Sequence, residues 1–166
     1  TVKECEGNNG TSNVSVIDNN KRILRTAAIY GANGSGKSTV IAAMDIFKAM
    51  TLQSFVDENI VKRLSNLYYH FDKASVNGPI SMQMIFVCNE ERYRYGFEIK
   101  QGKVLTEWLY VLLKGSTKES YCFKRDGQDI KVNSKVMKGT RGVTSKTRSN
   151  ALFLSTSAQF NVEMAM

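Results

Sequence analysis

The chain has 166 residues, of which 42% are hydrophobic, so it is long enough to form one domain with a sizeable core. No apolar run is long enough to cross a membrane and no signal-peptide pattern begins the chain, which excludes a membrane-spanning class and predicts no membrane partner. The 3 scattered cysteines argue against a disulfide framework or structural zinc and favour a cytoplasmic location, while the net charge of +8 fits nucleic acid, an acidic partner protein or a solvated surface.

The N-terminal residues 1–20 are polar and rich in Asn and Gly. Val14, Val16 and Ile17 are the side chains there that could form a strand, so we expect a loop or a weakly ordered hairpin edge. A short apolar run follows at residues 23–24 and 27–30. This run predicts a buried parallel strand that leads into the next segment.

Residues 30–39 read YGANGSGKST and match the phosphate-binding pattern G-x-x-x-x-G-K-[ST] at every fixed position. Glycines let the backbone turn tightly and bring its N–H groups within reach of phosphate oxygens, where a Cβ would obstruct. The loop then opens a helix, whose N-terminus adds free N–H donors and positive partial charge. The predicted nucleotide-binding residues are Gly31, Asn33, Gly34, Ser35, Gly36, Lys37, Ser38 and Thr39.

Three side chains of this loop have distinct expected roles. Lys37 should reach the β- and γ-phosphates and is a catalytic candidate. The Ser38 hydroxyl should ligand Mg²⁺, and Thr39 is placed to hydrogen-bond an α-phosphate oxygen. Strand, loop and helix patterns occur in the required order, which favours nucleotide binding over a glycine-rich turn that matches by chance.

Two periodicities follow the loop. Apolar residues recur at helical spacing over residues 40–50 and again over 52–67, which predicts two amphipathic helices. From residue 80 the period changes to two, and short polar turns separate the apolar runs. This pattern predicts an antiparallel β-meander over residues 80–132, with a hairpin signal at Asp126 and Gly127.

A basic stretch and a final helix are expected after the meander. Residues 133–149 are rich in Lys, Arg, Ser, Thr and Gly, and a flexible solvated loop is favoured over a phosphate-binding surface. Little aromatic interleaving occurs there, so a stacking groove for single strands is not supported. Residues 150–166 predict a C-terminal helix. The candidate nucleic-acid contacts are Lys131, Lys135, Lys138 and Arg141.

The hydrolytic residues of a P-loop enzyme are harder to find. Such an enzyme needs an acid at the end of a second core strand to order Mg²⁺. Residues 84–91 form an apolar run that ends in acids, but they continue into the alternating Arg92-Tyr93-Arg94-Tyr95. Residues 89–91 are therefore predicted to be a hairpin turn. The sequence also has no N-K-x-D motif for reading a guanine base, which argues against a GTPase.

Several segments together resemble a known family. Residues 31–38, with Asn33 before the middle glycine, resemble the Walker A loop of ABC-type ATPase heads, including SMC proteins. The segments ERYRYGFE, TEWLY and NALFLSTSAQFN narrow the resemblance to the N-terminal half of bacterial ABC-type ATPases of abortive-infection and other anti-phage systems. These are relatives of the OLD-family ATPases. The resemblance covers nearly the whole chain from about residue 21 onward.

The resemblance implies an α/β fold: a partial P-loop NTPase head of the ABC type with an inserted antiparallel β-meander subdomain. It implies ATP and Mg²⁺ as cofactors, and a Walker B acid, signature motif and switch histidine in a C-terminal half that this sequence lacks. A longer chain is therefore expected. In ABC heads a glutamine just after the β-subdomain contacts Mg²⁺ and the attacking water, and Gln159 is the nearest candidate by position. One partial domain over residues 1–166 would comprise a P-loop strand and helices (21–67), the β-subdomain (80–132), the basic loop (133–149) and the helix (150–166).

The function implied by the resemblance is an ATP-binding and ATP-hydrolysing module of a bacterial anti-phage defence protein. Two ATPs would be sandwiched between heads in a homodimer or higher homo-oligomer, and nucleotide state would gate a nuclease or other toxic effector, either separate or fused. A small P-loop kinase and a basic nucleic-acid-binding module are the alternatives. The meander and the lack of a βαβ repeat count against the kinase.

Overall fold

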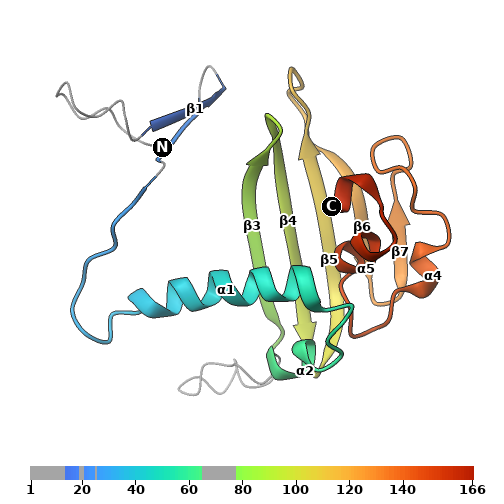
Figure 1. Ribbon diagram of the computed structural model, residues 1–166, viewed down its shortest axis with the longest axis horizontal. Coiled ribbons are helices and arrows are strands. Elements are labelled where there is room, and N and C mark those ends of the chain that lie inside the picture. Colours follow the sequence, from blue (N-terminus) through green and yellow to red (C-terminus); the bar gives the residue numbers. More distant parts are fainter. Residues whose placement is uncertain (1–13, 19–20, 25, 65–77) are drawn as a thin grey trace. The chain divides into compact units, whose positions relative to one another are not determined.

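In a computed structural model, the described residues are 14–18, 21–24, 26–64 and 78–166. The chain divides into two compact units, Thr1–Ile41 and Ala42–Met166. Among the described residues the first unit contains a two-stranded sheet and the second a five-stranded sheet (Figure 1).

The first unit contains a hairpin, where a loop or a weakly ordered hairpin edge is predicted for residues 1–20. Strands β1 (Val14–Asp18) and β2 (Lys21–Leu24) pair antiparallel. The buried parallel strand predicted over residues 23–24 and 27–30 is wrong, because residues 23–24 belong to an antiparallel strand, residues 27–30 form no strand and Tyr30 is 91% exposed. In both sheets of the described residues, each strand pairs antiparallel with the strand next to it in the sequence. Among the described residues, the apolar run at 27–30 therefore has no parallel strand to pair with.

Helices supply the α part of the fold. The first predicted helix is confirmed, but the second is much shorter than the pattern over 52–67 indicates, and residues 65–67 lie outside the described part of the chain. Among the described residues no helix is both long and apolar enough to cross a membrane. The helices are α1 (Lys37–Gln53), α2 (Ile60–Leu64), α4 (Val143–Lys146), α5 (Phe153–Gln159) and the 3-10 helix η2 (Glu163–Ala165).

Asp57 explains why the second helical pattern is interrupted. Its carbonyl accepts the N–H of Ile60 at 3.2 Å, and its carboxylate accepts the N–H of Asn59 at 2.9 Å. A short acidic side chain that bonds the backbone just ahead of it favours a turn and a new helix start over continuation of a helix. The chain therefore turns after α1 and starts again as α2.

The C-terminal helix predicted over residues 150–166 is also shorter in the structure, where it is split into α5 and η2. Asn161 lies in the left-handed region with φ 56°. The N–H of Val162 bonds the carbonyl of Ser157 at 3.0 Å, and the N–H of Asn161 bonds that of Ala158 at 3.0 Å. This pair of bonds around a left-handed residue is the Schellman motif, which ends a helix.

The predicted meander over residues 80–132 is confirmed. Its five strands pair antiparallel in chain order. The turn residues Asn89 and Glu90 have φ values of 51° and 65°, as a two-residue type I′ hairpin turn requires. Residues 89–91 thus belong to a hairpin, as the alternation indicated. The strands are β3 (Ile80–Cys88), β4 (Glu91–Lys100), β5 (Lys103–Leu112), β6 (Ser120–Asp126) and β7 (Asp129–Val132).

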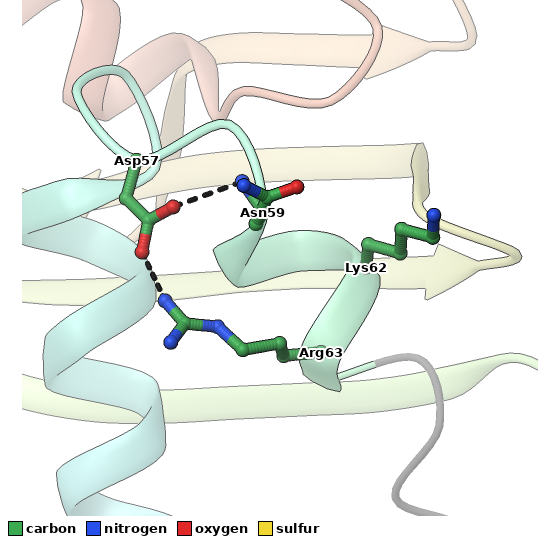
Figure 2. Close-up of a pocket in the computed structure, with 4 residues that line it drawn as sticks. All are labelled: Asp57, Asn59, Lys62 and Arg63. Carbon is green, nitrogen blue, oxygen red and sulfur yellow. Dashed lines mark hydrogen bonds and ion pairs between the residues drawn. The ribbon is translucent and has the colours of Figure 1, made fainter.

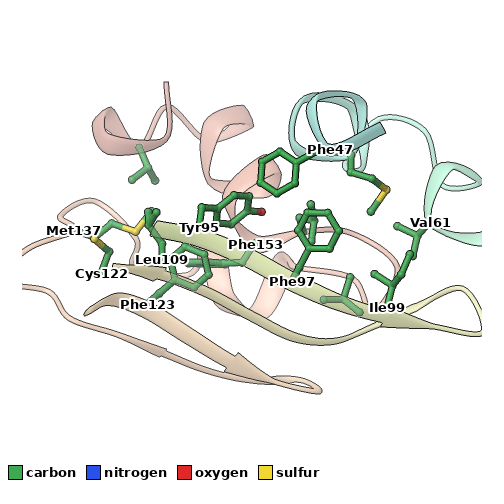
Figure 3. Close-up of a cluster of buried hydrophobic side chains, with 14 of the residues drawn as sticks. Phe47, Val61, Tyr95, Phe97, Ile99, Leu109, Cys122, Phe123, Met137 and Phe153 are labelled. Atoms are coloured by element: carbon green, nitrogen blue, oxygen red, sulfur yellow. The ribbon is translucent and has the colours of Figure 1, made fainter. Parts of the chain in front are cut away.

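One face of this sheet carries the core of the second unit. Tyr95 and Phe97 of β4 point into it and are 1% and 0% exposed. Helices α2 and α5 and the part of α1 that belongs to this unit lie over this face (Figure 1), and their side chains meet it in the cluster of Figure 3. Phe47 of α1 stacks on Phe97 with ring centroids 5.4 Å apart, and Phe153 of α5 meets Phe123 of β6 edge-on at 4.8 Å. Aromatic packing therefore joins the helices to the sheet.

The basic stretch 133–149 is not a purely solvated loop. Met137 and Val143 are 0% and 3% exposed and belong to the core. The Thr147 hydroxyl donates to the carbonyl of Val143 at 3.0 Å across the short helix α4. A few apolar side chains therefore anchor this segment to the core. They are too few among the basic residues to form a recognisable apolar pattern in the sequence.

Candidate nucleotide-binding site

The phosphate-binding loop adopts the conformation that its glycines predict. Gly34 and Gly36 have φ values of 80° and 88°, a left-handed region that costs a residue with a Cβ roughly 1–2 kcal/mol. A Cβ added at either position would meet nothing within 4 Å, so the backbone there faces open space. At Gly31 an added Cβ would lie 2.7 Å from the Ser35 Oγ. A Cβ at Gly31 would therefore require the exposed Ser35 hydroxyl to move, whereas Gly34 and Gly36 are favoured by their left-handed backbone.

Lys37 folds back over the loop that precedes it. Its Nζ donates to the carbonyl oxygens of Gly31 at 2.8 Å and Ala32 at 2.7 Å, and it lies 3.4 Å from the Ser35 Oγ. These bonds hold the ammonium group across the loop, beside the glycines whose backbone faces open space. The positive charge is thus placed where an anion entering the loop would meet it.

The start of α1 adds backbone donors to this charge. The first helical bond runs from the N–H of Val40 to the carbonyl of Gly36 at 3.2 Å, so the N–H groups of residues 37–39 precede the helical ladder. The first turn of α1 contains no acidic residue that would compensate their partial positive charge. Ser38 and Thr39 are exposed in the same turn. Ammonium, hydroxyl and N–H donors without a carboxylate suit a polyphosphate.

The remaining candidate residues lie elsewhere in the chain. Gln159 is the last residue of α5 and is exposed in the unit Ala42–Met166, whereas the loop belongs to the unit Thr1–Ile41. Its proposed contact with Mg²⁺ stays a prediction. Lys131 is an exposed residue of β7, and the other proposed nucleic-acid contacts, Lys135, Lys138 and Arg141, are exposed on the segment that follows.

The sequence did not predict a buried ion pair in the second unit. Glu107 and Arg125 have side chains that are 0% exposed, with Oε2 and Nη1 3.5 Å apart. Glu107 also accepts the Tyr95 hydroxyl at 2.9 Å and the N–H groups of Phe153 at 2.6 Å and Leu154 at 3.0 Å. Burial raises the pKa of Glu107, and the charge of Arg125 and these hydrogen bonds oppose that shift. The Glu107 carboxylate, on strand β5, thereby caps the N-terminal end of α5.

Polar side chains around a pocket at the start of α2 bond to one another and to the backbone (Figure 2). Asp57, Asn59, Lys62 and Arg63 line it. Asp57 accepts from the guanidinium of Arg63 as well as from the N–H of Asn59. Its carboxylate therefore stabilises the start of α2.

An α/β chain with this phosphate-binding loop is expected among nucleotide-binding proteins of the AAA type. A family model described as "AAA domain, putative AbiEii toxin, Type IV TA system" matches residues 27–157, from just before the loop to α5. The chain belongs to this family, which confirms its resemblance to ATPases of abortive-infection systems. Comparisons with curated proteins and with solved structures found no match.

Proposed function

We propose that the chain binds ATP with Mg²⁺ at residues 31–39 and acts as the nucleotide-binding module of an ATPase in an abortive-infection or toxin–antitoxin system. The observation that carries this proposal is the Lys37 ammonium group held over a loop with two left-handed glycines at the start of α1. The family match over residues 27–157 supports nucleotide chemistry, and it counts against a small metabolite kinase.

Each group of the loop has a role in this proposal. Lys37 exchanges its bonds to the loop carbonyls for bonds to the β- and γ-phosphates, and the N–H groups of the loop and of the first turn of α1 cradle the chain of phosphates. The Ser38 hydroxyl holds Mg²⁺, which supplies charge neutralisation on those phosphates when bound. Thr39 donates to the α-phosphate. Because the first turn of α1 has no acid, the acid that orders the metal and the water comes from another part of the assembly.

The finer proposal concerns assembly. Asn33 in the loop and the confirmed meander support an ABC-type arrangement, in which ATP is sandwiched between the heads of a homodimer or higher homo-oligomer. Nucleotide state then gates a nuclease or another toxic effector. Gln159 is our candidate for contacting the metal and the attacking water in that assembled state.

Titration with a fluorescent ATP analogue in the presence of Mg²⁺ tests the site. Lys37→Ala should weaken binding by roughly 10-fold or more, because a hydrogen bond to a charged group contributes about 1.5–3 kcal/mol. Lys48→Ala is a matched control, since Lys48 is an exposed lysine of the same helix and should leave affinity unchanged. Wild-type affinity in the Lys37 variant would overturn the proposal.

A second variant separates the metal role from damage to the loop. Ser38→Ala should weaken binding in Mg²⁺ but leave the residual binding in EDTA unchanged, because the substitution removes a metal ligand and no phosphate donor of the backbone. Equal losses with and without Mg²⁺ would contradict the assignment of Ser38 to the metal.

A further inference from the structure

We propose that the outer face of the β-meander is a stacking platform for single-stranded nucleic acid, centred on Trp108. This function is independent of the nucleotide site. We call this surface the outer platform, and it consists of Gln83, Arg94, Trp108, Tyr110, Lys124 and Lys131, which line one pocket, together with Tyr121.

Strand alternation places these residues on the face opposite the core. Since Tyr95 and Phe97 of β4 point inward, their neighbours Arg94 and Gly96 point outward. The register then aligns Gly96, Trp108, Lys124 and Lys131 in one row across β4 to β7. Arg94, Tyr110 and Tyr121 form the adjacent row. Two rows of aromatic and cationic side chains therefore cross the sheet.

Trp108 is held flat on the sheet. A Cβ added at Gly96 would lie 2.5 Å from Cζ2 and 2.7 Å from Cε2 of Trp108, so the indole covers the backbone where a side chain is missing. The indole Nε1–H donates to the Gln83 Oε1 at 3.1 Å, which fixes the ring in its own plane. Trp108 remains half-buried, with its outer side lining the pocket. A ring fixed in this way stacks on a base without a further loss of side-chain freedom.

Cations lie beside the aromatic rings. The Arg94 guanidinium is 4.1 Å from the Tyr110 ring centroid, and its Nη2 donates to Glu119 at 2.8 Å. The Lys124 Nζ is 5.3 Å from the Tyr110 ring centroid. Lys131 follows one strand further along the row and is exposed. Lysines next to flat aromatic faces can bind phosphates while the bases stack.

The fold brings together what the sequence keeps apart. Phosphate contacts were expected from Lys131 and the basic stretch after it, where few aromatics are interleaved. Pairing of β5, β6 and β7 places Trp108 beside Lys124 and Lys131, and so provides the missing rings. The acids Asp126 and Asp129 lie in the next row, and Asp129 pairs with Lys131 at 3.3 Å. The phosphates of a bound single strand therefore follow the row of Lys124 and Lys131, away from these acids.

A single strand fits this chemistry better than other anions. A duplex hides the faces of its bases, and an acidic peptide would use the lysines without needing a fixed indole. Single-stranded DNA and RNA share the chemistry required, so the experiment includes both.

Trp108 is the only tryptophan of the chain, so its fluorescence reports stacking directly. The 166-residue protein is titrated with a 12-mer of thymidine, a 12-mer of uridine, a 12-base-pair duplex and poly-glutamate. We expect saturable quenching by one or both single strands and at least about 10-fold weaker binding of the duplex and the polypeptide. Equal binding of the duplex, or binding of poly-glutamate instead, would overturn the proposal.

Two charge-matched double variants separate the platform from general basicity. Lys124→Gln with Lys131→Gln should weaken binding of the labelled single strand, measured by anisotropy. The slope of log K against log salt is negative, and this double variant should make it less steep by about 1.4, since each phosphate contact of a single strand contributes about 0.7. Lys135→Gln with Lys138→Gln removes the same charge outside the platform and should change the slope much less. Equal effects of the two pairs would refute the proposed location.

Replacement of the indole tests stacking itself. Trp108→Leu should weaken single-strand binding by roughly 10-fold, since stacking on one base contributes about 1–3 kcal/mol, and should leave binding of the fluorescent ATP analogue unchanged. Wild-type single-strand affinity in this variant would overturn the platform. If this variant does not fold, the exposed lysine pairs still decide the question.

Discussion

Glu107→Gln is the substitution that most directly tests how the second unit is held together. The amide has nearly the same shape but no charge, so the buried guanidinium of Arg125 loses its counter-charge. Removing one partner of a buried ion pair typically costs about 3–5 kcal/mol. Arg125 keeps three carbonyl acceptors, those of Gly127, Arg148 and Ala151, which places the expected loss near the lower end, at about 3 kcal/mol.

The new amide NH₂ adds to this loss. Each carboxylate oxygen accepts one backbone N–H at the start of α5, so whichever oxygen the NH₂ replaces, two donors face each other. The end of the helix that this carboxylate caps should therefore loosen. We expect the loss of hydrogen-exchange protection to be concentrated in α5.

Urea unfolding followed by the emission of Trp108 measures the free energy of unfolding. Glu98→Gln provides the control, because this half-buried residue of β4 undergoes the same chemical change and accepts from the Thr106 hydroxyl at 3.2 Å. The control should lose less than about 1 kcal/mol. If Glu107→Gln also lost less than about 1 kcal/mol, the buried pair would not hold α5 to the sheet.

Substitutions at three further positions test other parts of the structure. Gly96→Ala should displace the indole of Trp108, shift its emission to longer wavelength and cost about 1–3 kcal/mol; unchanged emission would contradict the close approach. The hydrogen bond from Arg94 lowers the pKa of Glu119 below its usual 4.5, so its stabilisation is present above that pH and lost as pH falls. Glu119→Gln should therefore flatten the fall of stability in acid, and an unaltered acid limb would refute this contribution. Asn161→Gly should preserve or raise the melting temperature, whereas Asn161→Ala should lower stability by about 1 kcal/mol, since φ is 56° there; equal stability of the two variants would be inconsistent with a left-handed helix end.

The meander and the loop could be predicted because their signals are local. Alternation through Tyr93, Tyr95 and Phe97, followed by short polar turns, determines strands, faces and pairing without distant information. The loop pattern likewise determines the backbone of residues 31–36, whose left-handed glycines the structure contains.

The parts that could not be predicted depend on partners far away in the chain. Residues 27–30 have the composition of a buried strand, but a strand requires a neighbour to complete its hydrogen bonds. The end of α5 is a different case, because it depends on one local residue, Asn161, whose left-handed backbone interrupts an otherwise helical pattern. Glu107 and Arg125 are separated in sequence, and charged residues in strands are ordinarily assigned to the solvent face.

In strand β6, a one-residue irregularity determines which side chains face the core and which face outward. Under strict alternation Tyr121 and Phe123 would share a face, but the register between β5 and β6 shifts at Leu109 and Tyr110. The shift leaves Tyr121 outside and buries Phe123, so Lys124 points outward while Arg125 points inward. Two adjacent basic residues thereby acquire opposite roles: one joins the outer platform and the other neutralises a buried carboxylate. The same irregularity is thus a condition for both the proposed nucleic-acid surface and the ion pair that secures α5.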